Sequence, residues 1–232
     1  MARLETLPDA FATTVASLHR VAELIVAPAR KPDNEIALQA TDGGFGTPTF
    51  EYDGDSHQVR VEGAELVHAE GATERRAPLS SLSVAAEVVA ELLPPGAELD
   101  AAALQVDPVA AVALAAWYAF ADAVLNRLIA EASPADAPSS AILWPEHFDL
   151  AIESGDEGRG LRANYGASPG DEGHPQPYLY VGPWTAAVSG ELWQASGFSG
   201  AELGYAELVE ADNQDVAALD FFRARRDALA TS

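Results

Sequence analysis

The sequence predicts an α+β fold in which an antiparallel sheet, built from both halves of the chain, packs against a buried central helix with flanking helices. Residues 35–77 and 142–211 alternate apolar and polar side chains with a period of two, which is typical of strands with one wet face. A long apolar segment at 106–133 separates them. Helices and strands do not alternate one by one, so a doubly wound parallel sheet is not expected.

We expect a single α+β domain over residues 1–232, with a candidate internal joint at 134–140. A chain of this size buries roughly 70–75% of its unfolded surface, enough for a core without disulfides or metals. The segment "PADAPSS" at 134–140 has linker composition. It is also short enough to connect two elements of one core.

The first half predicts two helices around a meander of strands. Apolar residues recur at helical spacing from about Asp9 to Pro28, directly after Pro8. Four strand patterns follow, separated by turns that contain glycine: "EIALQAT", "TFEYDG", "HQVRVEG" and "AELVHAE". The next segment, "SSLSVAAEVVAELLPPG", predicts a second helix that ends at the paired prolines.

The third and longest predicted helix is the central one. Asp107 is the expected N-cap and Pro108 the first helical residue. The apolar surface goes most of the way round, which favours burial in the core. Its most apolar run, 109–121, is 13 residues long and too short to span a bilayer of ~30 Å. Within this helix Tyr118, Asp122 and Asn126 form one polar stripe, which we interpret as a narrow solvated face. If the helix is central, Asp122 is instead buried and needs a hydrogen-bonding partner.

The second half predicts further strands and a closing helix. The strand patterns are "ILWPEHFDLAIE", "LRANYGAS", "PYLYVGP" and "AELGYAELVEA". The closing helix is expected from Asp215 to about Leu229. Its predicted inward residues are Val216, Leu219, Phe222 and Leu229.

Charge and composition exclude several classes of function. The chain carries 36 acidic and 13 basic side chains, a net charge of −23, so we expect neither nucleic acid nor a membrane surface as a partner. The absence of cysteine excludes disulfides, iron–sulfur clusters and thiol nucleophiles. The N-terminal residues lack a signal-peptide pattern, which favours a cytoplasmic protein. There is no P-loop, and "DGGFG" is not followed by the helix of a dinucleotide-binding fingerprint, so no cofactor is expected.

The stretch from Leu143 to Trp184 concentrates histidine, carboxylate and aromatic side chains. If "WPEHFDLAI" is one strand, His147 and Asp149 share a face, because alternate residues of a strand point the same way. The loop "ASPGDEGHP" then brings Asp171, Glu172 and His174, and its prolines restrict its backbone. Tyr178 and Tyr180 share one face of the following strand, with Trp184 beyond them.

Five short blocks resemble, in the same order, a family of uncharacterised and mostly actinobacterial proteins, a domain of unknown function. They are "TVASLHRVAELI", "FEYDGDSHQVRV", "SLSVAAEVVAELL", "FDLAI" and "PYLYVGPW". The resemblance supplies no activity. It implies that His57, Asp149 and Tyr180 stand where the family also has His, Asp and Tyr.

Two functions remain open. The first is the binding of a small molecule or protein partner in a polar and aromatic pocket formed by residues 144–184. The second is a hydrolase or isomerase that uses His147, Asp149 and His174, with or without a divalent metal. No motif such as H-E-x-x-H supports a metal, so none is expected. The candidate pocket residues are His57, His147, Asp149, Asp171, His174, Tyr180 and Trp184.

Overall fold

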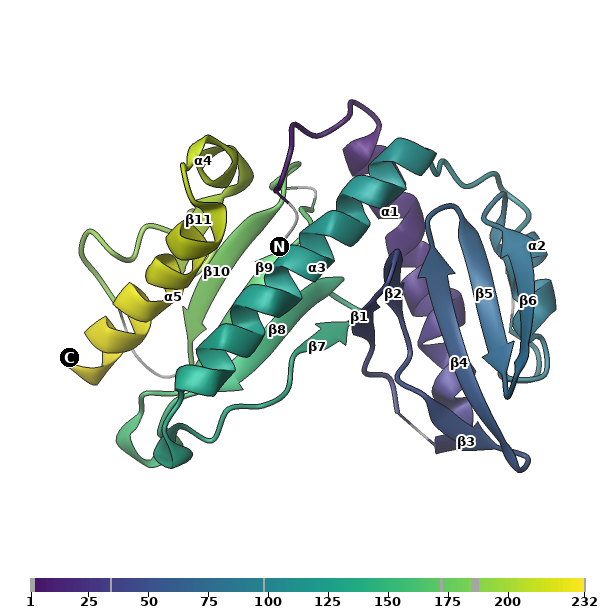
Figure 1. Cartoon of the computed structure of the whole chain (residues 1–232), viewed down its shortest axis with the longest axis horizontal. Coiled ribbons are helices and arrows are strands. Elements are labelled where there is room, and N and C mark those ends of the chain that lie inside the picture. The colour runs from purple at the N-terminus through teal and green to yellow at the C-terminus, as the bar shows by residue number, and fades with distance from the viewer. Residues whose placement is uncertain (1–2, 34, 98, 172, 185–187, 232) are drawn as a thin grey trace. The chain divides into compact units, whose positions relative to one another are not determined.

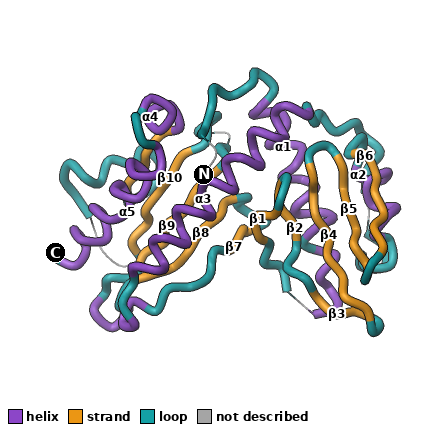
Figure 2. Tube along the Cα trace, viewed as in Figure 1, coloured by secondary structure: helices purple, strands orange, loops and turns teal. Residues whose placement is uncertain are grey.

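The computed structural model describes residues 3–33, 35–97, 99–171, 173–184 and 188–231 (Figures 1 and 2). The chain folds into two compact units. The N-terminal unit comprises Leu7–Ala119 and Leu143–Phe148. The C-terminal unit comprises Met1–Thr6, Phe120–Ile142 and Asp149–Ser232. The long helix α3 (Pro108–Glu131) begins in the first and ends in the second.

The N-terminal unit contains a six-stranded antiparallel sheet and the helix α1 (Phe11–Val21). The helix continues as a π-helical turn, η1 (Ala22–Val26), and then as the 3₁₀ segment η2 (Pro28–Asp33). The strands are β1 (Gln39–Thr41), β2 (Gly44–Gly46), β3 (Phe50–Tyr52), β4 (Asp55–Glu62), β5 (Glu65–Glu70) and β6 (Thr73–Pro78). Their order is β1-β2-β4-β5-β6, and β3 pairs with β4.

The burial of β4 shows why this region forms strands. His57, Val59 and Val61 are buried, whereas the residues between them are half-buried, as period-two alternation requires. The second predicted helix is shorter than expected. It consists of α2 (Leu82–Ala86), capped by the Ser81 hydroxyl, and the 3₁₀ turn η3 (Glu87–Val89).

Helix α3 begins as the sequence predicts. The Asp107 carboxylate accepts hydrogen bonds from the backbone N–H groups of Val109 and Ala110, both at 2.9 Å, and Pro108 is the first helical residue. By length and composition α3 could cross a membrane, as core helices of soluble proteins also could. Half of its most apolar stretch is buried.

Two expectations about α3 are corrected. Val109 and Val112 are 67% and 63% exposed, so the helix has a buried face and an exposed stripe instead of burial on nearly all sides. Tyr118 does not belong to a solvated face, because it is fully buried and its hydroxyl donates to the carbonyl of Phe148 at 2.7 Å. Burial raises the pKa of Asp122, one turn further along.

The C-terminal unit is built on the second antiparallel sheet. Its strands are β7 (Ile142–Trp144), β8 (Asp149–Ser154), β9 (Ala163–Ser168), β10 (Tyr178–Pro183) and β11 (Ala201–Gly204). The order is β11-β10-β9-β8-β7, and β7 carries the chain from one unit to the other. Helices α4 (Tyr205–Glu210) and α5 (Gln214–Ala230) follow. Helix α5 lies across one face of this sheet, where Phe222 packs edge-on against Tyr165 of β9 (Figure 1).

The α+β class and the antiparallel pairing are confirmed, but the strands of the two halves form two sheets instead of one. Each strand pairs mainly with its neighbours in sequence, so each half completes its own sheet. One isolated antiparallel bridge, Leu38–Leu143, joins a first-half segment to a second-half segment inside the N-terminal unit. The single domain stays a prediction. The candidate joint at 134–140 lies within the C-terminal unit.

Three elements of the second half differ from expectation. "ILWPEHFDLAIE" is two strands, because a turn at 145–148 interrupts it. "AELGYAELVEA" is a short strand followed by α4, whose first turn is closed by the Glu207 carboxylate accepting from the backbone N–H of Gly204 at 3.3 Å. On α5, Leu219, Phe222 and Leu229 are buried as predicted, but Val216 is 41% exposed.

Candidate functional site

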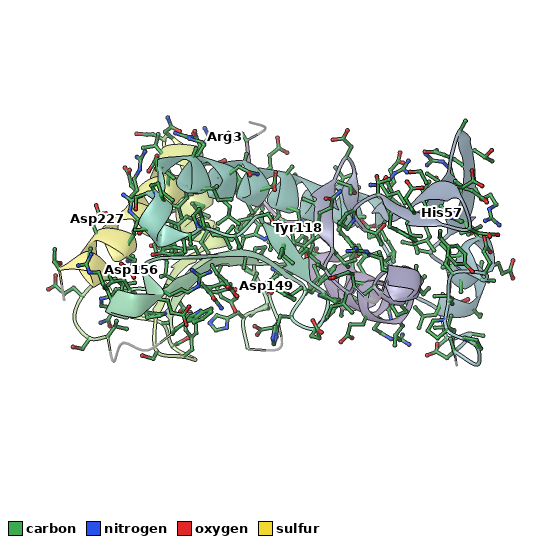
Figure 3. All side chains as sticks on the ribbon, turned by 90° about the horizontal axis from the view of Figure 1, so that it is seen from below. Arg3, His57, Tyr118, Asp149, Asp156 and Asp227 are labelled. Carbon is green, nitrogen blue, oxygen red and sulfur yellow. The ribbon has the colours of Figure 1, made fainter. Side chains whose placement is uncertain are left out.

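The face of the β8–β11 sheet that α5 does not cover carries most of the predicted site residues. We call it the open face. Antiparallel pairing aligns Tyr178 with Ser168, and Tyr180 with both Gly166 and Glu202. Leu179 and Val181 alternate with the tyrosines and are buried on the other face, as the sequence predicts. Figure 3 shows Asp149, at the start of β8, on the side of the sheet away from α5.

The centre of the open face is a contact between Tyr180 and Asp149. The Tyr180 hydroxyl donates to Oδ2 of Asp149, and Asp149 is only 6% exposed. The Tyr180 ring reaches β8 by lying across β9 directly above Gly166, where a Cβ atom would meet ring atoms at 2.4–2.5 Å. Burial, followed by the negative charge of Asp149, raises the pKa of the Tyr180 hydroxyl. This hydroxyl therefore stays protonated and acts as a donor at neutral pH.

A compact turn holds Asp171 and His174 beside the tyrosines. The Asp171 carboxylate accepts from the backbone N–H groups of Gly173 at 2.7 Å and His174 at 2.8 Å, and from the Tyr178 hydroxyl at 3.3 Å. The Asp171 N–H in turn donates to the His174 carbonyl at 2.7 Å. The turn chemistry expected of "ASPGDEGHP" is thus present. Glu172 lies outside the described residues.

His174 links this turn to β11 and to the segment before it. Its Nε2 lies 3.2 Å from the Ser196 hydroxyl and 3.3 Å from Oε2 of Glu202. Its Nδ1 lies 3.8 Å from Oδ1 of Asp171, and its ring packs against Tyr178 with centroids 4.7 Å apart. The imidazole therefore lies between two carboxylates and a serine hydroxyl.

Trp184 lies further along the same sheet and is 46% exposed. Its indole N–H donates to the Asn164 side-chain oxygen at 2.7 Å. The Arg162 guanidinium sits 5.2 Å from the indole centroid and pairs with Glu153 at 3.2 Å. Trp184 is therefore an exposed aromatic group with a fixed orientation.

The structure brings Asp149, Asp171, His174 and Tyr180 into one connected cluster, but His57 and His147 belong to the N-terminal unit. His147 is an exposed residue of the turn at 145–148, so the expectation that it shares a strand face with Asp149 is wrong. Pro145 has no N–H for a strand ladder, and Phe148 adopts a positive φ of 54° to close the turn. His57 is buried in β4 against His68.

Sequence reasoning missed three residues of the cluster: Gly166, Ser196 and Glu202. Gly166 and Glu202 could have been found only with the pairing register of β9, β10 and β11, which places both beside Tyr180. Ser196 lies on an irregular segment with no strand or helix period, so no signal pointed to it.

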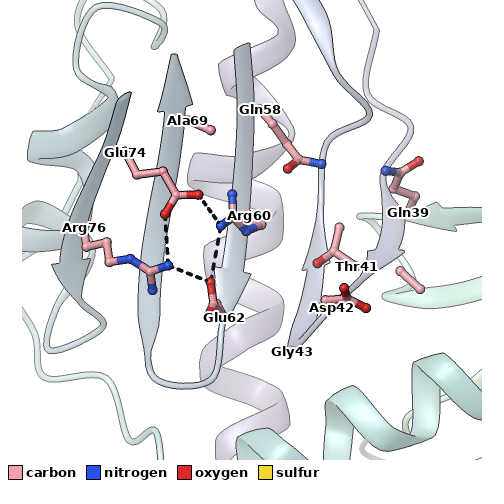
Figure 4. A pocket seen from close by; sticks show the side chains of 11 residues that line it. Gln39, Thr41, Asp42, Gly43, Gln58, Arg60, Glu62, Ala69, Glu74 and Arg76 are labelled. Atoms are coloured by element: carbon pink, nitrogen blue, oxygen red, sulfur yellow. Dashed lines mark hydrogen bonds and ion pairs between the residues drawn. The ribbon is translucent and has the colours of Figure 1, made fainter. Parts of the chain in front are cut away.

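The described residues contain no group of three or more His, Asp or Glu side chains arranged to hold a metal ion. A separate hollow of about 860 Å³ lies on the six-stranded sheet of the N-terminal unit (Figure 4). Both arginines of its lining already pair with carboxylates, since Arg60 and Arg76 each contact Glu62 and Glu74. We assign it no ligand.

No family model, no curated protein and no solved structure matches this chain. The resemblance to the actinobacterial family therefore stays a prediction.

Proposed function

We propose that this chain is a cytoplasmic binding protein whose open face takes a small organic cation, such as a compound with a primary or quaternary ammonium group. The observation that carries the proposal is the connected cluster of Asp149, Tyr180, Tyr178, Asp171, His174 and Glu202. Acidic groups predominate in this cluster, which contains three carboxylates and one imidazole.

The side chains of the cluster suit a cation better than an anion. Carboxylates accept hydrogen bonds from an ammonium group, and tyrosine rings attract cations through their π faces. Tyr178 and Tyr180 lie next to each other, and Phe198 packs edge-on against Tyr180, so the carboxylates are flanked by aromatic surface. The net charge of −23 adds long-range attraction for a cationic ligand.

The test is a nuclear magnetic resonance titration of the whole protein with spermidine, L-argininamide and choline, with glycerol and acetate as neutral and anionic probes. We expect saturable shifts for the cations, confined to backbone amides of β8–β11 and the 171–174 turn. Glu202→Gln should weaken binding about fivefold, because a partly exposed ion pair contributes about 1 kcal/mol.

A matched control is Asp212→Asn, which removes the same charge from an exposed residue between α4 and α5. It should leave the affinity unchanged if the site is local. If Asp212→Asn and Glu202→Gln weaken cation binding equally, the binding depends on the overall charge of the protein and not on a local site. Shifts caused by acetate and glycerol but by none of the cations would overturn the proposal.

A second candidate function is hydrolysis through Ser196. Ser196 Oγ lies 3.2 Å from Nε2 of His174, and Asp171 lies on the Nδ1 side of the same ring. This order of hydroxyl, imidazole and carboxylate is the one that activates a serine nucleophile. It ranks second because Glu202 contacts both Ser196 Oγ, at 3.3 Å, and His174 Nε2. The 3.8 Å separation on the Nδ1 side is also longer than a hydrogen bond.

A fluorophosphonate probe tests the second candidate directly. An activated Ser196 would form an O–P bond as the P–F bond breaks, with fluoride leaving and the hydroxyl proton passing to His174 Nε2. Labelling that is lost in Ser196→Ala but kept in Ser199→Ala would support hydrolysis. If the probe does not label Ser196 and the protein binds cations, hydrolysis is rejected and cation binding remains as the proposed function.

A further inference from the structure

The N-terminal unit buries two histidines in direct contact. Nδ1 of His57 on β4 lies 2.9 Å from Nε2 of His68 on β5, and both residues are at most 3% exposed. Nε2 of His57 lies 3.2 Å from the carbonyl of Tyr52. Because a carbonyl only accepts, His57 carries its proton on Nε2, and its Nδ1 accepts from the N–H at Nε2 of His68.

The remaining ring nitrogen of His68 has two partners with opposite requirements. Its Nδ1 lies 2.9 Å from the carbonyl of Val88 in η3 and also 2.9 Å from a guanidinium nitrogen of Arg75 on β6. The carbonyl can be bonded only if Nδ1 carries a proton. The guanidinium, which only donates, can be bonded only if Nδ1 does not.

The protonation state of His68 therefore selects one of two hydrogen-bond arrangements. With His68 neutral, Arg75 donates to Nδ1 and links β6 to β5. With His68 protonated, Nδ1 donates to Val88, which links β5 to η3. Arg75 then keeps its carboxylate partners Glu91 and Glu70, both of which it already contacts.

We propose that His68 and Arg75 form a pH-sensitive switch at the junction of β5, β6 and η3, in which a proton on His68 exchanges the Arg75 hydrogen bond for one to Val88. No other donor or acceptor has to enter the core, because both partners are already within 2.9 Å of the same nitrogen.

The charged groups around His68 set the pH at which the exchange occurs. Burial is the largest influence and lowers the pKa of His68 below its ordinary value of 6.5; Arg75 and His57 act in the same direction. The Val88 carbonyl and Glu91 oppose this decrease. Glu91 Oε1 lies 3.6 Å from Nδ1, and Glu70 reaches the site through Arg75. The exchange is accordingly expected on the acid side of pH 6.5.

The experiment is an imidazole titration by nuclear magnetic resonance, which follows the ring nitrogens of His68 and the carbonyl carbon of Val88 from pH 8 to pH 4.5 in the native protein. We expect His68 to gain a proton at Nδ1 while the protein stays folded, with the Val88 carbonyl shift changing at the same midpoint. Arg75→Gln should raise the His68 midpoint by about half to one pH unit, and Glu91→Gln should lower it.

Arg76→Gln is the matched control, because Arg76 is the next residue of β6 and pairs instead with Glu62, Glu65 and Glu74. Loss of the same charge there should leave the midpoint nearly unchanged. The proposal is overturned if His68 gains its proton only when the protein unfolds, or if the Val88 signal does not follow it. An equal shift in both arginine variants would also overturn it. If Arg75→Gln does not fold, the wild-type titration of His68 and Val88 decides.

Discussion

Tyr180 reaches Asp149 because the residue between them has no side chain. The strand β9 separates the two, and its Gly166 leaves room for the tyrosine ring. Glycine in a strand interior has a cost in backbone entropy and in lost packing, so a structural reason for it is expected. Here the reason is the close approach of the ring, which allows a buried carboxylate to accept a hydrogen bond.

Gly166→Ala should displace Tyr180 from Asp149. The added methyl group would lie 2.4–2.5 Å from atoms of the Tyr180 side chain, which is closer than van der Waals contact allows, so the ring must move. We expect a loss of about 1–3 kcal/mol in the free energy of unfolding, measured with denaturant, from overpacking and the broken hydrogen bond. Gly182→Ala is the control, since a Cβ there meets nothing within 4 Å. If both variants are equally stable, the ring is not held as described.

At the scale of elements, the sequence predicted most helices and strands of regular period. β4, β9, β10, α3 and α5 agree with the patterns at those positions. It missed helix α4, which lies within a predicted strand, and it failed at two junctions. The turn at 145–148 interrupts "ILWPEHFDLAIE", whose polar and apolar residues also alternate as in a single strand. Pro145 was the only local indication of the turn. The end of α2 and η3 at Val89 precedes the prolines by several residues, so the prolines alone did not locate it.

The N-cap of α3, which the sequence predicts, should contribute measurably to the stability of the protein. Asp107 satisfies two backbone N–H groups that otherwise have no partner within the helix. Asp107→Ala should therefore cost about 1 kcal/mol in the free energy of unfolding, while Asp107→Asn should cost only a fraction of that. Thermal or denaturant unfolding measures both. Asp212→Ala, at an exposed position, serves as the control, and an equal loss there would point to charge instead of capping.

At the scale of the whole molecule, the candidate site could be predicted only in part. The composition of residues 143–184 pointed to Asp149, Asp171, His174 and Tyr180, because these side chains were close in sequence. The composition could not identify Glu202, which strand pairing places next to Tyr180. It also could not show that His147 lies in a turn and Asp149 in the strand that follows. The His57–His68 contact depends on the register of β4 and β5, which the sequence leaves open.

The buried tyrosines of the C-terminal unit predict sensitivity to alkaline pH. Burial raises the pKa of Tyr165 and of Tyr205 to about 12, above the ordinary value of 10. The unfolded chain then loses these protons first as the pH rises. Their contribution to stability is fully present below pH 10 and is lost as the pH rises from 10 to about 12.

Stability should fall in this window by up to about 1.4 kcal/mol per pH unit for each buried tyrosine. Denaturant unfolding at several pH values measures how steeply the free energy of unfolding falls with pH. Tyr165→Phe should reduce this slope by the contribution of one buried tyrosine. A slope that is the same in the variant and the wild type would contradict the assignment. Phenolate absorbance in the folded protein should appear well above pH 10 for these residues.

The charge of the whole chain predicts that it does not bind nucleic acids. At least eight of the arginines pair with carboxylates, so few positive groups are available to neutralise phosphates. We expect no mobility shift of duplex DNA or single-stranded RNA at about 150 mM salt. A second measurement at lower salt distinguishes electrostatic repulsion from weak binding of nucleic acid. Proteins that bind phosphate bind more tightly as salt decreases, whereas a net charge of −23 is repelled more strongly because screening weakens. A shift that appears or grows at about 20 mM salt would contradict the prediction.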